Sequence, residues 1–203
     1  MEEKMKQVLY KWLEIDLVNI AKKMGLSDKS CDVNLELLMD TIRCLDYESV
    51  IVEKPSINYI ITVIGLMWEH VDHTKFDLRK FVIKILSRIG YPTSAIICDK
   101  DFDKENGTFS GLDSWIDEVS LTINQMKNEI MVANQKYLLT DYQKQIWDSM
   151  DSDKVLGISA PTSAGKSFVI LLKLVDRLIN DNIDIVYIVP TLSLLNQVTE
   201  DFN

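Results

Sequence analysis

The sequence predicts an all-helical domain over residues 1–136, followed by the beginning of an α/β domain with a parallel sheet over residues 137–203. Apolar residues recur at steps of three and four through the first part, which is the period of amphipathic helices. Two short apolar runs in the second part, residues 155–158 and 185–189, are typical of buried parallel strands. A glycine-containing loop and a helical pattern lie between these runs.

Five helices are expected in the first part, over residues 3–24, 33–45, 57–71, 74–90 and 114–136. The inner face of the first helix is predicted to be Leu9, Leu13, Leu17, Ile20 and Met24, widened by Met5, Val8, Trp12 and Ile15. The apolar stripe of the last helix is Ile116, Val119, Ile123, Met126, Ile130 and Ala133. This last stripe fits either a short coiled-coil seam or, as we favour, packing within the domain.

The composition is that of a globular protein. The 203 residues are 47% hydrophobic and 26% charged, and no apolar run is long enough to cross a membrane. The first residues do not have the pattern of a signal peptide. Three widely spaced cysteines, Cys31, Cys44 and Cys98, fit reduced thiols. These features predict a cytoplasmic protein without a membrane partner.

The charge is acidic, with a net value of -9, and both predicted domains are negative. Such a chain is not expected to hold nucleic acid tightly by itself. The helix over residues 74–90 nevertheless has a basic outer face that includes Lys80, Lys84 and Arg88. This face could contact nucleic acid. We favour the alternative, a solvated helix surface.

The loop between the two apolar runs carries the clearest chemistry. It consists of Ala160, Pro161, Thr162, Ser163, Ala164, Gly165, Lys166 and Ser167. Gly165 allows the backbone to approach phosphates closely, and a helix start beneath the loop offers N–H groups to them. Lys166 would neutralise the β- and γ-phosphates of ATP, and the Ser167 hydroxyl would be a ligand of Mg²⁺. The sequence therefore predicts a nucleoside triphosphate site.

This loop resembles motif I of superfamily 2 DExH/DEAD-box helicases, whose first residue is commonly Ala instead of Gly. The Pro-Thr-Ser-Ala version is most similar to DExH helicases, including the exosome-cofactor branch. The resemblance implies a RecA-like domain that uses ATP and Mg²⁺. It also implies that Gln143, 23 residues before Lys166, reads the adenine edge, with the aromatic Tyr142 beside it.

A second match follows the loop. Residues 190–197 fit motif Ia of these helicases, P-T-x-x-L-x-x-Q, which contacts the nucleic-acid backbone. The matching residues here are Pro190, Thr191, Ser193 and Gln197. The resemblance thus implies DNA or RNA as a partner of the parent protein. The match covers residues 137–203, and residues 1–136 resemble no family that we can name.

The acidic Asp-Glu pair of motif II does not follow the loop within these 203 residues. We therefore expect an N-terminal part of an ATP-dependent helicase or translocase that does not hydrolyse ATP by itself. One alternative is that the helical domain is a protein-interaction module of a helicase subunit. Helicases of this branch occur in bacterial two-component antiphage defence systems such as Hachiman. A further alternative is another kind of P-loop NTPase.

Overall fold

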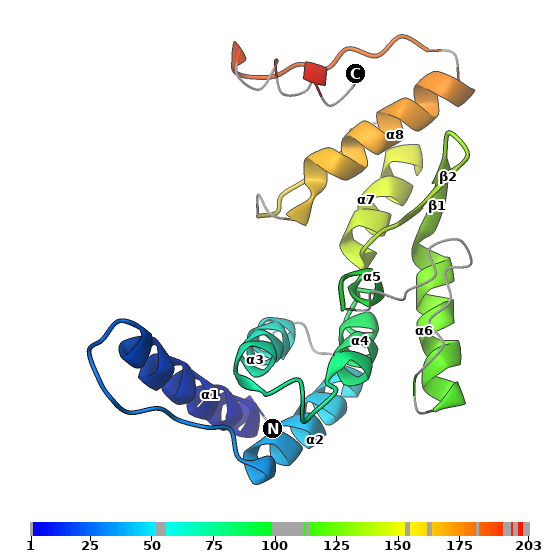
Figure 1. The fold of residues 1–203 in the computed structure, drawn as a ribbon. Coiled ribbons are helices and arrows are strands. Elements are labelled where there is room, and N and C mark those ends of the chain that lie inside the picture. Colours follow the sequence, from blue (N-terminus) through cyan, green and yellow to red (C-terminus); the bar gives the residue numbers. More distant parts are fainter. Residues whose placement is uncertain are drawn as a thin grey trace. The chain divides into compact units, whose positions relative to one another are not determined.

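The computed structural model describes residues 2–51, 56–98, 112, 114–152, 155–161, 164–181, 183–192, 196 and 199–200. In these residues the chain is mostly helical (Figure 1). The elements are α1 (Glu2–Lys23), α2 (Leu35–Ile51), α3 (Ser56–His70), α4 (Arg79–Arg88), α5 (Ser94–Cys98), α6 (Trp115–Asn128), β1 (Glu129–Val132), β2 (Gln135–Leu138), α7 (Asp141–Ser152) and α8 (Lys166–Asn180).

The chain divides into two compact units. The helical unit comprises Met1–Ile130 and Leu138–Lys144, and the loop unit comprises Met131–Tyr137 and Gln145–Asn203. The division passes through the strands β1 and β2 and through the first turns of α7. Each unit is described by itself below.

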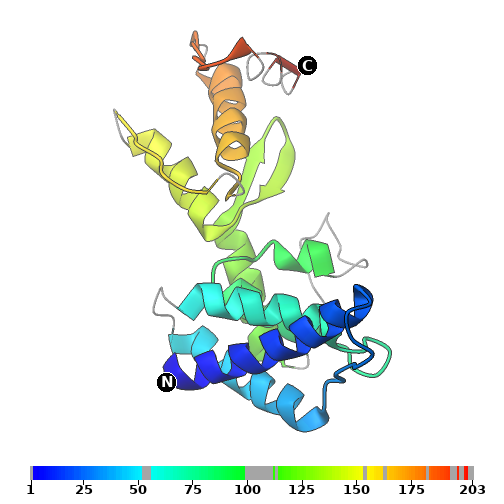
Figure 2. The same cartoon turned by 90° about the vertical axis from the view of Figure 1, so that its left-hand side faces the viewer.

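The core of the helical unit lies where α1, α2, α3 and α4 pack together. α1 packs against α3 and α2, and α2 also packs against α4; Figure 2 shows α1 in blue across these helices. Trp12 of α1 is fully buried, and its Nε1–H donates to Thr41 Oγ1 at 2.9 Å. The fully buried apolar side chains of this core include Met5, Trp12, Leu38, Leu45, Ile60, Val63, Met67, Val82 and Ile85.

The predicted inner face of α1 is wrong in its second half. Leu17 and Met24 are 66% and 69% exposed, whereas Met5, Val8, Trp12 and Ile15 form the buried face. Both sets of residues recur at steps of three and four, so periodicity alone did not choose between them. The indole of Trp12 decides the orientation, because its N–H must find a partner inside the core and does so in Thr41.

The predicted inner face of α6 is also wrong. Ile116, Val119, Ile123 and Met126 are all exposed. The buried residues of this helix are Leu121, Gln125 and Asn128, and Leu121 packs with Ile83 of α4. α6 therefore turns a largely polar face toward the rest of the helical unit and an apolar face outward.

The last helix of the domain is shorter than predicted, because residues 129–138 form a two-stranded hairpin instead. Ala133 and Asn134 both have positive φ, at 49° and 63°, which is the backbone of a two-residue hairpin turn. The β-branched Ile130 and Val132 are buried on one face of β1. The alternation of these two residues and the turn-forming Asn134 outweigh the helical period that predicted a longer helix.

The boundary of α4 also differs from the prediction. The helix begins at Arg79, where the Asp77 carboxylate accepts the backbone N–H of Arg79 at 3.1 Å. Thr74, the predicted cap, instead lies in a turn and donates its hydroxyl to Asp72 at 2.6 Å. The predicted end at Gly90 is close, since Gly90 has a φ of 97° just after the helix.

The predicted parallel sheet is not seen in the described part of the loop unit. Residues 155–160 and 183–189 have no regular secondary structure, so the prediction of strands there is not confirmed. Val155, Val186 and Ile188 are 92%, 83% and 87% exposed, so none of the described strands or helices covers them. A buried parallel strand depends on such cover on both faces, which explains why these apolar runs remain without strand pairing here.

None of the described helices is long and apolar enough to span a membrane. Cys31, Cys44 and Cys98 are free thiols, as expected.

Candidate functional site

The glycine-lysine-serine loop leads directly into α8. Gly165 has φ 70° and ψ 27°, a left-handed conformation that favours glycine, and it is the N-cap residue of the helix. Just before it, the Ala164 N–H donates to the Pro161 carbonyl at 3.1 Å. Lys166 and Ser167 are consequently the first two residues of α8. Thr162 and Ser163, also predicted to bind nucleotide, lie outside the described residues.

The Lys166 ammonium lies against the carbonyls of its own loop. Its Nζ donates to the carbonyl oxygens of Ala160 and, at 2.8 Å, of Pro161. The positive charge is thereby held at the start of α8, where the first N–H groups of a helix have no intrahelical acceptors. A cation and unpaired helix N–H groups at one place favour an anion. Ser167 is exposed in this first turn, so its hydroxyl is accessible to a ligand.

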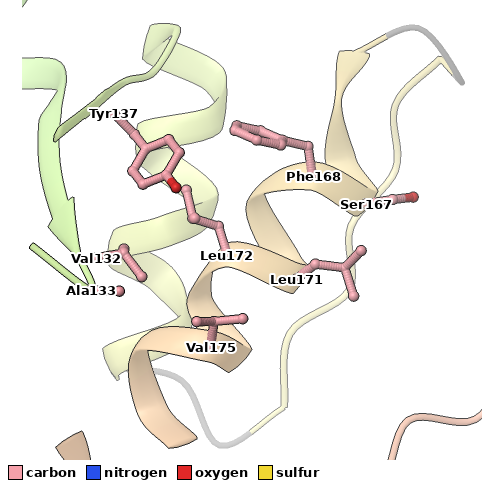
Figure 3. Close-up of a pocket in the computed structure, with 8 residues that line it drawn as sticks. All are labelled: Val132, Ala133, Tyr137, Ser167, Phe168, Leu171, Leu172 and Val175. Atoms are coloured by element: carbon pink, nitrogen blue, oxygen red, sulfur yellow. The ribbon is translucent and has the colours of Figure 1, made fainter. Parts of the chain in front are cut away.

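A pocket of about 430 Å³ adjoins this helix start (Figure 3). Tyr137 from β2 and Phe168 from α8 form an edge-on aromatic pair at its rim, with ring centroids 6.3 Å apart. The remaining lining residues are mostly aliphatic: Val132, Ala133, Ser167, Leu171, Leu172 and Val175. Sequence reasoning missed this pocket, because it depends on a hairpin that the sequence did not predict.

The start of α7 is fixed by reciprocal hydrogen bonds. The Gln143 N–H donates to Thr140 Oγ1 at 3.2 Å, and the Thr140 N–H donates to Gln143 Oε1 at 3.0 Å. This is a capping box, with Thr140 as the N-cap residue. The amide oxygen of Gln143, predicted to read adenine, therefore also caps the helix. A carbonyl oxygen has a second lone pair that could still accept from a base.

Neighbouring contacts anchor the same turn within the helical unit. The Asp141 N–H donates to the Gly90 carbonyl at 2.9 Å, and Asp141 Oδ1 accepts from Asn128 Nδ2 at 2.6 Å. The hydroxyl oxygen of Tyr142 is buried and finds no hydrogen-bond partner in the described structure. Tyr142 and Gln143 thus lie on a helix start that several hydrogen bonds hold in place.

The rest of α7 is held against α8 within the loop unit by a buried lysine. Lys173 is 4% exposed, and its Nζ is 2.7 Å from Asp151 Oδ2. The same ammonium lies 4.1 Å from the ring centroid of Trp147. Arg177 adds a hydrogen bond to the Met150 carbonyl at 2.8 Å and an ion pair with Asp151 at 3.1 Å. These contacts fix the helix that begins at Lys166.

The residues predicted to contact a nucleic-acid backbone are only partly described. Pro190 and Thr191 are exposed and follow the irregular stretch 183–189. Ser193 and Gln197 lie outside the described residues. The described residues therefore do not test the prediction that this segment contacts nucleic acid.

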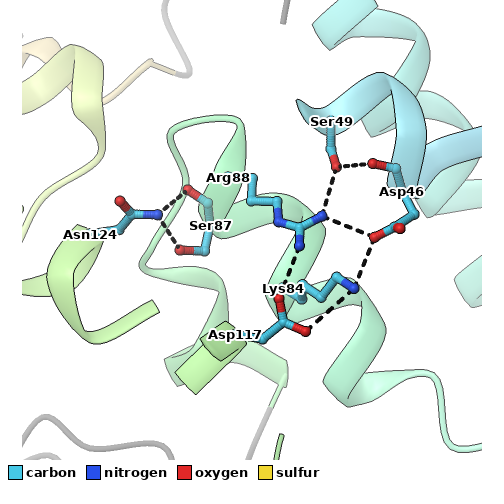
Figure 4. A network of polar contacts seen from close by, with 7 residues as sticks. All are labelled: Asp46, Ser49, Lys84, Ser87, Arg88, Asp117 and Asn124. Atoms are coloured by element: carbon cyan, nitrogen blue, oxygen red, sulfur yellow. Dashed lines mark hydrogen bonds and ion pairs between the residues drawn. The ribbon is translucent and has the colours of Figure 1, made fainter. Parts of the chain in front are cut away.

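The predicted basic face of α4 is not an outer face at two of its positions. Lys84 and Arg88 are 24% and 23% exposed and lie between Asp46 of α2 and Asp117 of α6 (Figure 4). Arg88 is 2.9 Å from each carboxylate, and Lys84 is 2.9 Å from Asp46 and 3.5 Å from Asp117. Their charge is already balanced inside the helical unit, which does not favour phosphate binding. Lys80 is partly buried and also has an interaction partner.

A separate cluster joins Asp16, Glu69 and His70, whose ligand-type atoms lie within 4.8 Å of one another. Two contacts already engage these groups. His70 Nε2 is 2.8 Å from Asp16 Oδ1, and Glu69 accepts from Lys23 at 3.1 Å. We interpret the cluster as a structural link between α1 and α3, because an ammonium beside Glu69 opposes binding of a metal ion.

Comparison with known proteins supports the interpretation of the loop. Residues 140–203 match the family model of the DEAD/DEAH box helicase. The resemblance to superfamily 2 helicases is therefore confirmed for this segment, which includes Gln143, the glycine-lysine-serine loop and residues 190–197. No curated protein and no solved structure matches the chain.

Proposed function

We propose that residues 137–203 are the beginning of a RecA-like ATP-binding domain, and that loop 160–167 binds the triphosphate of ATP with Mg²⁺. One observation carries this proposal. The left-handed Gly165 is followed at once by a helix whose first residue is Lys166, and the lysine ammonium already lies over the loop. The helicase family match over residues 140–203 supports the same conclusion. It also favours a helicase over another kind of P-loop NTPase.

Each residue has a distinct role in this proposal. Lys166 exchanges its bonds to the carbonyls of Ala160 and Pro161 for the β- and γ-phosphate oxygens. The backbone N–H groups of Gly165 and Lys166 face the phosphates at the start of α8, and the Ala164 N–H keeps its bond to the Pro161 carbonyl. Bound Mg²⁺ would neutralise charge at the phosphates, and the Ser167 hydroxyl would be one of its ligands.

Gln143 selects adenine in this proposal, with Tyr142 beside it. Its amide offers one acceptor and two donors, which suits the adenine N6–H and N7 together. The test is competition of ATP and GTP for a fluorescent adenine nucleotide. We expect the wild-type chain to prefer ATP and Gln143→Ala to lose that preference. If Gln143→Ala has the same ratio of ATP to GTP affinity as the wild type, Gln143 does not recognise adenine.

We further propose that the parent protein is a nucleic-acid-dependent ATPase, a helicase or translocase acting on DNA or RNA. Pro190, Thr191, Ser193 and Gln197 would contact the strand backbone, as hydroxyls and helix starts commonly do. Because the net charge is -9, we expect weak binding of single strands, which weakens further with salt. Thr191→Ala should reduce that binding, whereas equal binding by Thr191→Ala and wild type would argue against this contact.

The 203 residues themselves should bind ATP without turning it over. No Asp-Glu pair follows the loop in this sequence, so these residues offer no motif II carboxylates to anchor the metal and position water. A phosphate-release assay tests this. Turnover by the purified chain that disappears in Lys166→Ala would contradict the proposal.

The second candidate function is that the helical unit is a protein-interaction module of a helicase subunit. Its supporting observation is α6, which presents apolar side chains outward and is held by polar contacts inside. A role in an antiphage defence system similar to Hachiman remains a prediction. Complex formation that survives Lys166→Ala but is lost in Ile123→Glu would support the module. Loss in Lys166→Ala alone would argue against it.

A further inference from the structure

The exposed surface of α6 is almost entirely apolar. Six residues of this helix are exposed, and Lys127 is the one polar residue among them. The other five are Trp115, Ile116, Val119, Ile123 and Met126, of which Trp115 and Met126 are 72% and 71% exposed. The polar face of a surface helix is normally the one exposed to solvent. An apolar stripe on the outer face therefore indicates an interaction surface.

Polar contacts on the opposite side of α6 fix this orientation. Asp117 bonds Arg88 at 2.9 Å, as Figure 4 shows. Asn124 Nδ2 donates to the Ser87 hydroxyl at 3.2 Å, and Asn128 donates to Asp141 at 2.6 Å. Rotating the helix to bury its stripe would break all three contacts and leave Arg88 with one carboxylate fewer. The outward stripe is thus a consequence of specific hydrogen bonds along the whole helix.

The stripe has the spacing that another helix requires. Ile116, Val119, Ile123 and Met126 alternate at steps of three and four, which are the a and d positions of a heptad seam. The pattern is also symmetric about its own midpoint. In an antiparallel pair of two such helices, Ile116 would face Met126 of the partner subunit, and Val119 would face Ile123 of the partner subunit.

The flanking residues suit the same arrangement. Ser120 and Thr122 lie beside the midpoint, where small neutral side chains allow close approach of the two helices. None of the described residues would bring like charges together on this face. We propose that this stripe is a self-association surface, through which α6 pairs antiparallel with α6 of a second copy of the chain.

This inference rests on the second candidate function, and it commits that module to one partner. Five side chains per copy bury on the order of 1,000 Å² in total, the low end of specific interfaces. The dimer should therefore be weak, with a Kd on the order of micromolar. Each copy carries a net charge of -9, so salt should strengthen the pairing by screening the repulsion.

Analytical ultracentrifugation of the full chain tests the proposal. From about 1 to 100 µM, a range set around the expected Kd, the wild type should shift from monomer toward dimer, and more so in high salt. Ile123→Glu and, separately, Val119→Glu should remain monomeric with unchanged circular dichroism, because both side chains are already exposed. Leu17→Glu is the matched control on α1, and it should dimerise as the wild type does.

Cross-linking distinguishes the orientation. Ser120→Cys lies near the proposed two-fold axis and should form an intermolecular disulfide, whereas Ile116→Cys should form one only in a parallel pair. A wild-type chain that stays monomeric throughout this range overturns the proposal, as does a dimer that persists in both glutamate variants. Binding of another protein by a monomeric wild-type chain, lost in Ile123→Glu, would overturn self-association and leave the interaction module standing.

Discussion

The ammonium of Lys173 lies 4.1 Å from the ring centroid of Trp147, so a buried cation on α8 rests on an aromatic face of α7. The same ammonium pairs with Asp151 at 2.7 Å. Because α8 begins at Lys166, this contact holds the helix that carries the lysine proposed to bind phosphate.

Removing this cation should destabilise the loop unit. We expect Lys173→Ala to lower the free energy of unfolding by about 1–3 kcal/mol, since it loses the aromatic contact and the ion pair and leaves a cavity. Urea denaturation followed by circular dichroism measures the effect. Lys11→Ala, at an exposed position of α1, is the matched control and should change stability by less than about 0.5 kcal/mol. Equal stabilities of the two variants would contradict the role of Lys173.

Glycine at position 90 is predicted to be required. Gly90 has a φ of 97°, and a Cβ placed there would lie 2.9 Å from Asp141 Oδ2. Gly90→Ala should therefore cost about 1–3 kcal/mol of stability. Gly65→Ala in α3 is the control, because its added Cβ would meet nothing within 4 Å. That variant should gain about 0.5–1 kcal/mol from helix propensity. Thermal melts of both variants make the comparison, and a stable Gly90→Ala would contradict it.

The ion-pair network between α2, α4 and α6 should give stability an acid-sensitive part. Burial alone would raise the pKa of Asp46, but hydrogen bonds and charges from Lys84 and Arg88 lower it below its usual value. The contribution of Asp46 is therefore present above an unfolded pKa of about 3.9 and is lost as the pH falls through the folded pKa.

Replacing Asp46 tests this dependence. Asp46→Asn should be less stable than the wild type at neutral pH, and its stability should fall less steeply below about pH 4. Lys84→Met removes one cause of the lowered pKa and should flatten the same region. Urea midpoints measured from pH 7 to the acid limit provide the data. An Asp46→Asn curve parallel to that of the wild type would be inconsistent with the network.

Much of the helical unit could be predicted from local signals. Glycine ended helices where expected, since Gly25 and Gly90 both adopt positive φ. The choice of buried face could not be predicted for α1 or α6, because each helix has more than one apolar or polar stripe at helical spacing. Hydrogen-bond partners distant in sequence determine which face is buried. Thr41 binds Trp12 of α1, and Ser87 and Arg88 bind the polar side of α6.

The loop was predictable for a different reason. Its chemistry is contained in eight consecutive residues, so a left-handed Gly165 ahead of a helix follows from local geometry. The pocket beside Phe168 was not predictable, because it needs Tyr137 from a hairpin that competes with a helical pattern. The apolar run at residues 185–189 depends on non-local contacts instead. A strand there requires neighbouring strands that the described residues do not provide.

The most direct test of the central claim is a calorimetric titration of the full chain with ATP and Mg²⁺. We predict saturable binding by the wild type and a loss of at least about tenfold in affinity for Lys166→Ala, since the variant loses the cation proposed to contact the phosphates. Lys11→Ala makes the same charge change far from the loop in sequence and should bind as the wild type does. Equal affinity of Lys166→Ala and wild type, or no binding by the wild type, would contradict the assignment of this loop.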